Sequence, residues 1–204
     1  MAFLRELFGP SKDEIWRQLC DQVGGEFVAG RFWTGSKVQV QHKQWTVTLD
    51  TFTESHGEHG SRTYTRMRAP YVNKDGFRFT VYRRGFFSDL GKLFGMQDVE
   101  IGEPEFDDAF IIKGNDEEKL RKLFADPRVR QLFERQPKIH LSVRDDEGWF
   151  QARFPEGVDE LYFREPGVIK DLDRLKALYD LFAEVLDRLC RIGSAYDDDP
   201  GVAL

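Results

Sequence analysis

Hydrophobic positions recur at two different spacings along this chain, one typical of helices and one typical of strands. Apolar residues follow helical spacing from Ile15 to Val23, after a capping-box pattern formed by Ser11 and Glu14. Residues 26–53 are instead rich in Val, Thr, Phe and Trp in near-alternation, which is typical of short antiparallel strands. We therefore expect one helix followed by three strands in the first quarter of the chain.

The strand pattern continues beyond residue 53. Residues 62–68 and 77–83 alternate in the same way, and turn-forming residues lie between them at 73–76. This spacing predicts an antiparallel meander that extends to about residue 84. A further apolar run centred on Ala109 to Ile112 indicates a strand within residues 101–113.

The second half of the chain ends in the longest apolar stripe of the sequence, at helical spacing from Ile169 to Ile192. Between residue 113 and this stripe the pattern predicts short helices at 117–124 and 127–134, a hairpin at 139–154 and a strand at 160–164. The fold class that follows is α+β, with a largely antiparallel sheet, short helices and a long C-terminal helix packed on the sheet.

Length and composition fit one domain. The chain has 204 residues, which is within the size that one hydrophobic core supports. We expect a single α+β domain over residues 1–194, with 1–97 and 98–194 as its alternative sub-units. Residues 195–204 carry three consecutive aspartates, a proline and a glycine, so they are expected to form a disordered acidic tail.

Charge and cysteine content narrow the classes of partner and location. The net charge of −6 argues against a nucleic-acid or anionic-membrane footprint over the whole protein. Cys20 and Cys190 are too few and too far apart for a disulfide framework, which favours a reducing compartment. With no apolar run long enough to cross a membrane, we expect a cytoplasmic protein. No glycine-rich phosphate loop is present, so no cofactor is indicated.

Two small groups of residues are candidates for catalysis or for metal binding. Asp107 and Asp108 flank an apolar run and could serve acid–base catalysis if one of them faces inward. His56 and His59 could bind a metal ion, although a histidine pair on a glycine-rich loop is more often a solvated surface. A lone histidine, His140, alternates outward from the predicted hairpin.

The most uneven feature is a local excess of positive charge. Residues 62–95 contain eight basic and two acidic residues, interleaved with aromatic side chains. This composition suits a surface for single-stranded nucleic acid on the basic strands 62–84, but it also suits basic strands that face the acidic C-terminal helix. The candidate binding-surface residues are Arg66, Arg68, Arg83, Arg84, Phe86 and Phe87.

Two short amphipathic stretches, residues 3–8 and 86–94, offer another kind of surface. They could join a protein partner, seal a dimer or touch a membrane interface peripherally, and each could equally cover the open face of the sheet. The spacing in residues 86–96 fits a helix and a loop equally well.

Several linked phrases in the second half resemble an uncharacterised bacterial protein family, a domain of unknown function. The resemblance covers about residues 98–190 and is carried by Phe106–Glu117, Leu123–Arg130, Asp145–Gly148 and Gly157–Phe163. It implies a bacterial setting and a recurring unit, and it assigns no catalytic residue.

These observations favour a non-catalytic bacterial module that binds a protein partner or a second copy of itself. The motivating observation is that fold signals are abundant, whereas no catalytic constellation is visible in the sequence. The first alternative is an enzyme or metal-binding protein that uses Asp107 and Asp108 or His56 and His59. The second alternative is a single-stranded nucleic-acid binder.

Overall fold

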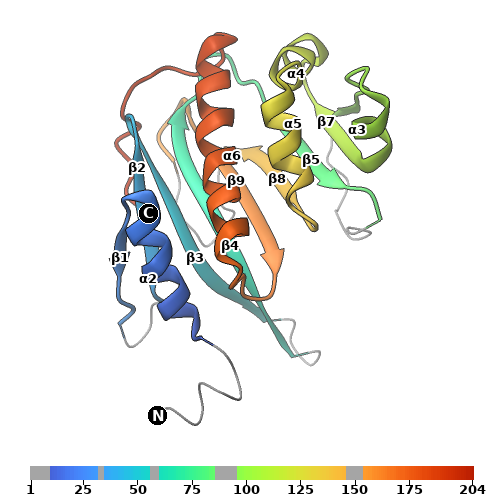
Figure 1. Cartoon of the computed structure of the whole chain (residues 1–204). Coiled ribbons are helices and arrows are strands. Elements are labelled where there is room, and N and C mark those ends of the chain that lie inside the picture. The colour runs from blue at the N-terminus through green and yellow to red at the C-terminus, as the bar shows by residue number, and fades with distance from the viewer. Residues whose placement is uncertain (1–9, 32–34, 56–59, 86–95, 146–153) are drawn as a thin grey trace.

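The computed structural model describes residues 10–31, 35–55, 60–85, 96–145 and 154–204. They form an α+β fold in which nine strands build one antiparallel sheet with the order β1-β2-β3-β4-β9-β8-β5-β7-β6. The long helix α6 lies across the middle of this sheet, with α2 on one side of it and α5 on the other (Figure 1). The predicted fold class is therefore confirmed.

The elements have the following bounds. The helices are α2 (Lys12–Val23), α3 (Pro104–Ala109), α4 (Glu117–Phe124), α5 (Pro127–Glu134) and α6 (Leu172–Arg191). The strands are β1 (Glu26–Val28), β2 (Lys37–His42), β3 (Trp45–Ser55), β4 (Ser61–Val72), β5 (Phe79–Arg83), β6 (Gln97–Asp98), β7 (Phe110–Gly114), β8 (His140–Arg144) and β9 (Val158–Pro166).

Local sequence signals explain where the first helix begins and ends. The Ser11 hydroxyl accepts a hydrogen bond from the Glu14 amide, and the Glu14 carboxylate accepts one from the Ser11 amide. This capping box satisfies two of the amides that the first turn leaves without helical partners. Gly24 then ends α2 with a φ of 69°, a left-handed conformation that glycine adopts without strain.

One face of the sheet is apolar across almost its whole width. Residues on neighbouring strands stand directly opposite one another in an unbroken row from β1 to β7, and every member of the row is hydrophobic. The row consists of Phe27, Val38, Leu49, Met67, Phe163, Leu141, Val81 and Ile112.

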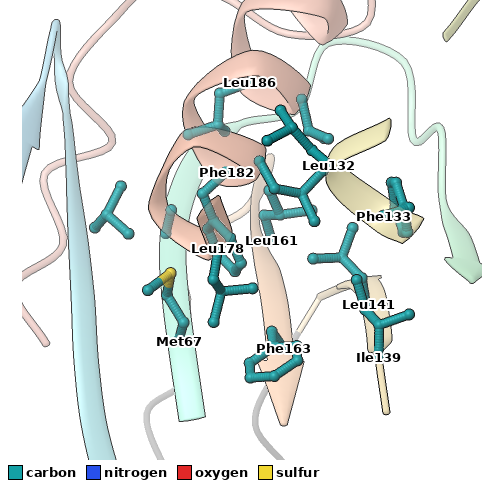
Figure 2. Close-up of a cluster of buried hydrophobic side chains, with 14 of the residues drawn as sticks. Met67, Leu132, Phe133, Ile139, Leu141, Leu161, Phe163, Leu178, Phe182 and Leu186 are labelled. Atoms are coloured by element: carbon teal, nitrogen blue, oxygen red, sulfur yellow. The ribbon is translucent and has the colours of Figure 1, made fainter. Parts of the chain in front are cut away.

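Helix α6 covers this apolar face with the stripe that its sequence predicts. Leu178, Phe182 and Leu186 are fully buried and point from α6 toward the sheet (Figure 2). Met67 from β4 and Leu161 from β9 meet them from below. Burying apolar surface of this kind is the main favourable contribution to folding, so the contact between α6 and the sheet holds the domain together.

A buried ion pair fixes the start of α6 over the sheet. Arg174 on α6 donates two hydrogen bonds to the carboxylate of Glu165 on β9. The Arg174 Nε–H also donates to the Gln136 side chain, which follows α5, at 3.0 Å. Because one guanidinium joins three elements, it sets the direction in which α6 crosses the sheet.

The predicted meander is wrong beyond β4. Strands β4 and β5 are neighbours in sequence, but β4 pairs with β3 and β9, whereas β5 pairs with β7 and β8. The turn residues at 73–76 do not close a hairpin, because the Asn73 side chain binds the amides of Asp75 and Gly76 and also donates to Asp159 on β9. This network turns the chain away from β4.

The strand predicted within residues 101–113 is present as β7, and a short helix that was not predicted precedes it. Pro104 stands in the first turn of α3, where a missing N–H costs nothing, and the strand β7 begins only at Phe110. In the predicted hairpin, β8 pairs with β5 and with β9, which runs from 158 to 166. Most of the expected second arm, residues 150–154, lies outside the described residues.

The C-terminal residues differ from the expectation of a disordered tail. Ala195 forms an antiparallel bridge with Asn73, and the Tyr196 amide donates to the Val72 carbonyl at 3.0 Å. The Leu204 carbonyl oxygen accepts from the Lys37 ammonium at 2.5 Å. These contacts place the segment along the edge of β4 and against β2. Within the described residues, no helix is long and apolar enough to cross a membrane.

Removing the centre of the α6 stripe tests the importance of this packing. We expect Leu178→Ala to lower the free energy of unfolding by about 2–5 kcal/mol, because a fully buried leucine leaves a cavity when truncated. Val168 is 39% exposed, so Val168→Ala is a matched control that should change stability by less than about 0.5 kcal/mol. Urea denaturation measures both, and equal effects would contradict the packing described.

Candidate functional site

The face of the sheet opposite the helices is polar across its full width. Its central row of cross-strand partners runs through all nine strands without an aliphatic residue. The row consists of Glu26, Gln39, Thr48, Arg68, Tyr162, Ser142, Thr80, Lys113 and Asp98. Successive side chains of a strand point to opposite faces, so the register that buries Met67 under α6 also directs Arg66 and Arg68 away from it.

Arginines and carboxylates are paired on the β3–β4 part of this face. The Arg66 guanidinium donates two hydrogen bonds of 2.8 Å to Asp50, one to each carboxylate oxygen. Arg68 donates to the same carboxylate, also at 2.8 Å. Both arginines are buried, and Asp50 is the described carboxylate that they share.

A second group of charged residues lies beside the first, on β8 and β9. Arg144 is stacked over the Tyr162 ring at 3.6 Å, and its Nε–H donates to the Ser142 hydroxyl at 3.0 Å. We use the name buried polar layer for the charged and polar side chains on this face from β3 to β8, which are Asp50, Arg66, Arg68, His140, Ser142, Arg144, Glu160, Tyr162 and Arg164.

Burial and neighbouring charges shift the pKa values of three side chains in this layer. His140 is only 3% exposed, and burial together with the positive charges of Arg144 and Arg164 lowers its pKa from 6.5 to about 3. Burial also raises the pKa of Tyr162, and it lowers the pKa of Arg144. His140 is therefore neutral at physiological pH, and the layer carries its positive charge on arginines.

The same face reaches the surface near the β3–β4 turn as an arginine–aromatic patch. Its members are Phe52, Arg62, Tyr64, Arg66 and Arg164. The Arg62 and Arg164 guanidiniums lie 5.8 and 5.5 Å from the centre of the Tyr64 ring. Arg66 lies 4.9 Å from the Phe52 ring, which is stacked on Tyr64. Arg62 is exposed, so the patch opens to solvent.

The two aspartates considered for catalysis have different positions. Asp107 lies in a hollow of about 410 Å³, next to Arg84 and Arg121. Its carboxylate accepts hydrogen bonds from the amides of Ile101, Gly102 and Glu103 at 3.0–3.1 Å. Asp108 is exposed. Asp107 thus acts as a clamp on the loop that precedes α3, and three backbone hydrogen bonds already occupy its carboxylate.

The other candidate residues are dispersed. Arg83 donates to the Glu134 carbonyl at the end of α5, and Arg84 donates to the carbonyls of Asp107 and Asp108 at the end of α3. These two arginines stabilise helix C-termini and lie apart from the buried polar layer. His56, His59, Phe86 and Phe87 lie outside the described residues. In the part of the chain that is described, no group of three or more histidines, cysteines and acids could hold a metal ion.

The basic strands and the acidic helix do not face each other. Acidic residues of α6 pair with other partners, as in the contacts of Asp187 with His42 and Lys43 and of Glu184 with Arg128. Arg66 and Arg68 lie on the opposite side of the sheet from α6. The hypothesis that the basic strands face the acidic C-terminal helix is therefore wrong.

Sequence reasoning missed most of the buried polar layer. His140 does point away from the helices, as its alternation predicts, but it is buried rather than exposed. A signal was present, because polar residues alternate through His140–Ser142–Arg144 and recur at Glu160, Tyr162 and Arg164. Their convergence depends on the pairing of β8 with β9 and of β9 with β4, which local patterns do not specify.

Comparison with known proteins adds one observation about the fold. No family model matches the chain, and no curated protein matches its sequence. The solved structures include the crystal structure of the mycobacterial trehalose monomycolate transport factor A, TtfA, which is similar with a TM-score of 0.53. The match covers 87% of this chain and 94% of that one at 9% identity, so it concerns the shared fold alone.

The three backbone hydrogen bonds of Asp107 distinguish it from its exposed neighbour Asp108. Asp107→Ala leaves three loop amides without their acceptor, and we expect it to lower the free energy of unfolding by about 1–3 kcal/mol. Asp108→Ala is the matched control, with an expected change below about 0.5 kcal/mol because the residue is exposed. Urea denaturation compares the two, and an equal loss in both variants would argue against the clamp.

The buried His140 makes stability depend on pH in a definite direction. Because its folded pKa of about 3 lies below the unfolded value of 6.5, the unfolded state binds the proton more readily between these values. The contribution of His140 is complete above pH 6.5 and is lost as the pH falls toward 3, by about 2 kcal/mol at pH 5. His140→Gln should flatten this part of the stability profile in urea denaturation. An unchanged slope would contradict the assignment.

Proposed function

We propose that this protein is a non-catalytic binding module whose arginine–aromatic patch binds an acidic segment of a partner protein. The observation that carries the proposal is the charge of the polar sheet face. In a chain of net charge −6, the part of this face on β3, β4, β9 and β8 bears five described arginines and three described carboxylates. The residues counted are Arg62, Arg66, Arg68, Arg144 and Arg164, with Asp50, Glu54 and Glu160.

The chemistry of the patch supports a protein partner of negative charge. Arginine and tyrosine are, with tryptophan, the residue types most enriched among the dominant residues of protein interfaces. A guanidinium held against an aromatic ring is already oriented, so less side-chain entropy is lost when its N–H groups bind a carboxylate. Glu54 gives an example within the protein, because it accepts from Arg164 at 3.1 Å.

Other features support a non-catalytic role. The Asp107 carboxylate already accepts three backbone hydrogen bonds, which disfavours it as an acid or base. The structurally similar TtfA is named a transport factor, and a role without catalysis agrees with that name.

The setting we propose is the bacterial cytoplasm. The resemblance of residues 98–190 to an uncharacterised bacterial family supports the bacterial origin. Both cysteines, Cys20 and Cys190, are free thiols, which agrees with a reducing compartment.

Charge reversal on the patch tests the proposal. A fluorescein-labelled poly-glutamate peptide should bind saturably in an anisotropy titration and weaken as salt is added. Arg62→Glu should weaken this binding by about tenfold, because it repels the peptide at an exposed cation of the patch. Arg191→Glu makes the same charge change at the exposed end of α6, and its affinity should stay within about twofold of the original.

Three outcomes would overturn the proposal. The first is that poly-glutamate does not bind, and the second is that both variants lose affinity equally, which indicates only a general charge effect. In the third, an oligo-deoxythymidine probe binds in preference to the peptide, which would favour the single-stranded nucleic-acid alternative.

A further inference from the structure

The arginine–aromatic patch is assembled from two strands at the point where they part. The pairing of β4 with β9 begins at Thr65, so among the described strands residues 61–64 of β4 pair with β3 alone. Arg62 and Tyr64 lie on this two-stranded part, whereas Arg164 lies on β9. A two-stranded ribbon is only marginally stable by itself, so the position of Tyr64 relative to Arg164 needs a further constraint.

Three hydrogen bonds supply this constraint. The segment that connects β9 to α6 runs beside β4, and its Gly167 forms a parallel bridge with Tyr64. The Gly167 amide donates to the Thr63 carbonyl at 2.8 Å. The Thr65 hydroxyl donates to the Gly167 carbonyl at 2.8 Å and accepts from the Ile169 amide at 2.9 Å. We use the name Thr65 latch for these three hydrogen bonds.

The Thr65 latch is built into the interior of the protein. The Thr65 side chain is fully buried, and Ile169 is buried as well. The Ile169 carbonyl accepts a hydrogen bond from the Trp16 Nε1–H at 3.3 Å, so α2 holds the same segment. A buried amide or carbonyl that loses its partner has no water to replace it. Loss of the Thr65 hydroxyl is therefore costly for both Gly167 and Ile169.

Tyr64 connects the latch to the patch. Successive side chains of a strand point to opposite faces, so Thr65 points toward the helices while Tyr64 points into the patch. The Tyr64 ring is stacked on Phe52 at 5.2 Å, and the Arg164 guanidinium lies 5.5 Å from its centre. Phe52 is the partner of Tyr64 on β3, and Gly167 is its partner on the other side. The backbone of Tyr64 is therefore held on both sides while the latch is closed.

We propose that Thr65 is a positioning residue of the arginine–aromatic patch and that the Thr65 latch controls binding at the patch. With the latch closed, Arg62 and Tyr64 stand beside Arg164 and bind one acidic segment together. With the latch open, the two strands offer separate and weaker contacts. The Glu54–Arg164 ion pair also joins these strands, but both side chains are partly exposed, and such pairs are weak. This inference rests on the proposed function for the ligand of the patch.

Removal of one hydroxyl group tests the inference with the fluorescein-labelled poly-glutamate peptide. Thr65→Val keeps the shape of the side chain and removes two bonds of the latch, so binding should weaken about fivefold because the patch must then be ordered by the ligand. Thr65→Ser restores the hydroxyl, and its affinity should stay within about twofold of the original. Thr53→Val is the matched control, because its exposed hydroxyl bonds the Thr63 hydroxyl outside the latch, and its affinity should also stay within about twofold.

Amide hydrogen exchange in the original protein keeps the test independent of the folding of any variant. Coupling between two sites is reciprocal, so a ligand that needs the closed latch must also keep the latch closed. Saturating poly-glutamate should slow exchange of the Gly167 and Ile169 amides by at least about fivefold, the factor by which Thr65→Val weakens binding. The Lys122 amide on the short helix α4 is the control, and its exchange rate should not change.

Three results would overturn the inference. The first is that Thr65→Val binds poly-glutamate as tightly as the original protein. The second is that Thr65→Ser loses as much affinity as Thr65→Val, which indicates that the hydroxyl is not the group that matters. The third is that saturating poly-glutamate leaves the exchange rates of the Gly167 and Ile169 amides unchanged.

The two proposals fail in different ways. If poly-glutamate binds but neither its affinity nor the amide exchange depends on the latch, the binding module stands and the role of Thr65 is wrong. If poly-glutamate does not bind at all, NOEs between the Tyr64 ring and the Arg164 side chain decide. Loss of these NOEs in Thr65→Val and their return in Thr65→Ser would leave Thr65 as a positioning residue of a patch with another ligand, whereas unchanged NOEs would overturn both proposals.

Discussion

The structure depends on the packing of α6 across the apolar face of β4 and β9. The centre of the apolar stripe of this helix is fully buried, and it meets a row of hydrophobic side chains that runs through eight of the nine strands. Strand side chains alternate between faces, so a slip of one residue would turn Met67 and Phe163 outward. The contact therefore fixes the register of the sheet.

The polar face is a consequence of the same register. Once Met67 and Phe163 point to α6, Arg66, Tyr162 and Arg164 must point the other way. Charged groups in a poorly hydrated layer are stable when they have ion-pair or hydrogen-bond partners, and Asp50 serves two arginines in this way. Arg144 is held in another way, by the Tyr162 side chain and the Ser142 hydroxyl, with Glu160 opposite it on β9.

The sequence predicts the elements better than it predicts their arrangement. The capping box at Ser11 and the leucine-rich stripe of α6 are local signals, and both are confirmed. The neighbours of β4 are not local, because β9 lies almost one hundred residues further on and, together with β8, separates β4 from β5. The buried polar layer depends on these distant pairings. Asp107 illustrates the same limit, since its three amide donors lie in the loop that precedes α3 and no local pattern indicates this contact.

The most direct test of the account is a methyl NOE experiment on the folded protein. The central claim is that Met67 lies beneath α6, so its methyl group should show NOEs to Leu178 and Phe182 (Figure 2). These cross-peaks are the result that the register predicts. If Met67 shows none of them and the side chains of Arg66 or Arg68 contact α6 instead, the two faces of the sheet are exchanged and the proposed binding surface is wrong.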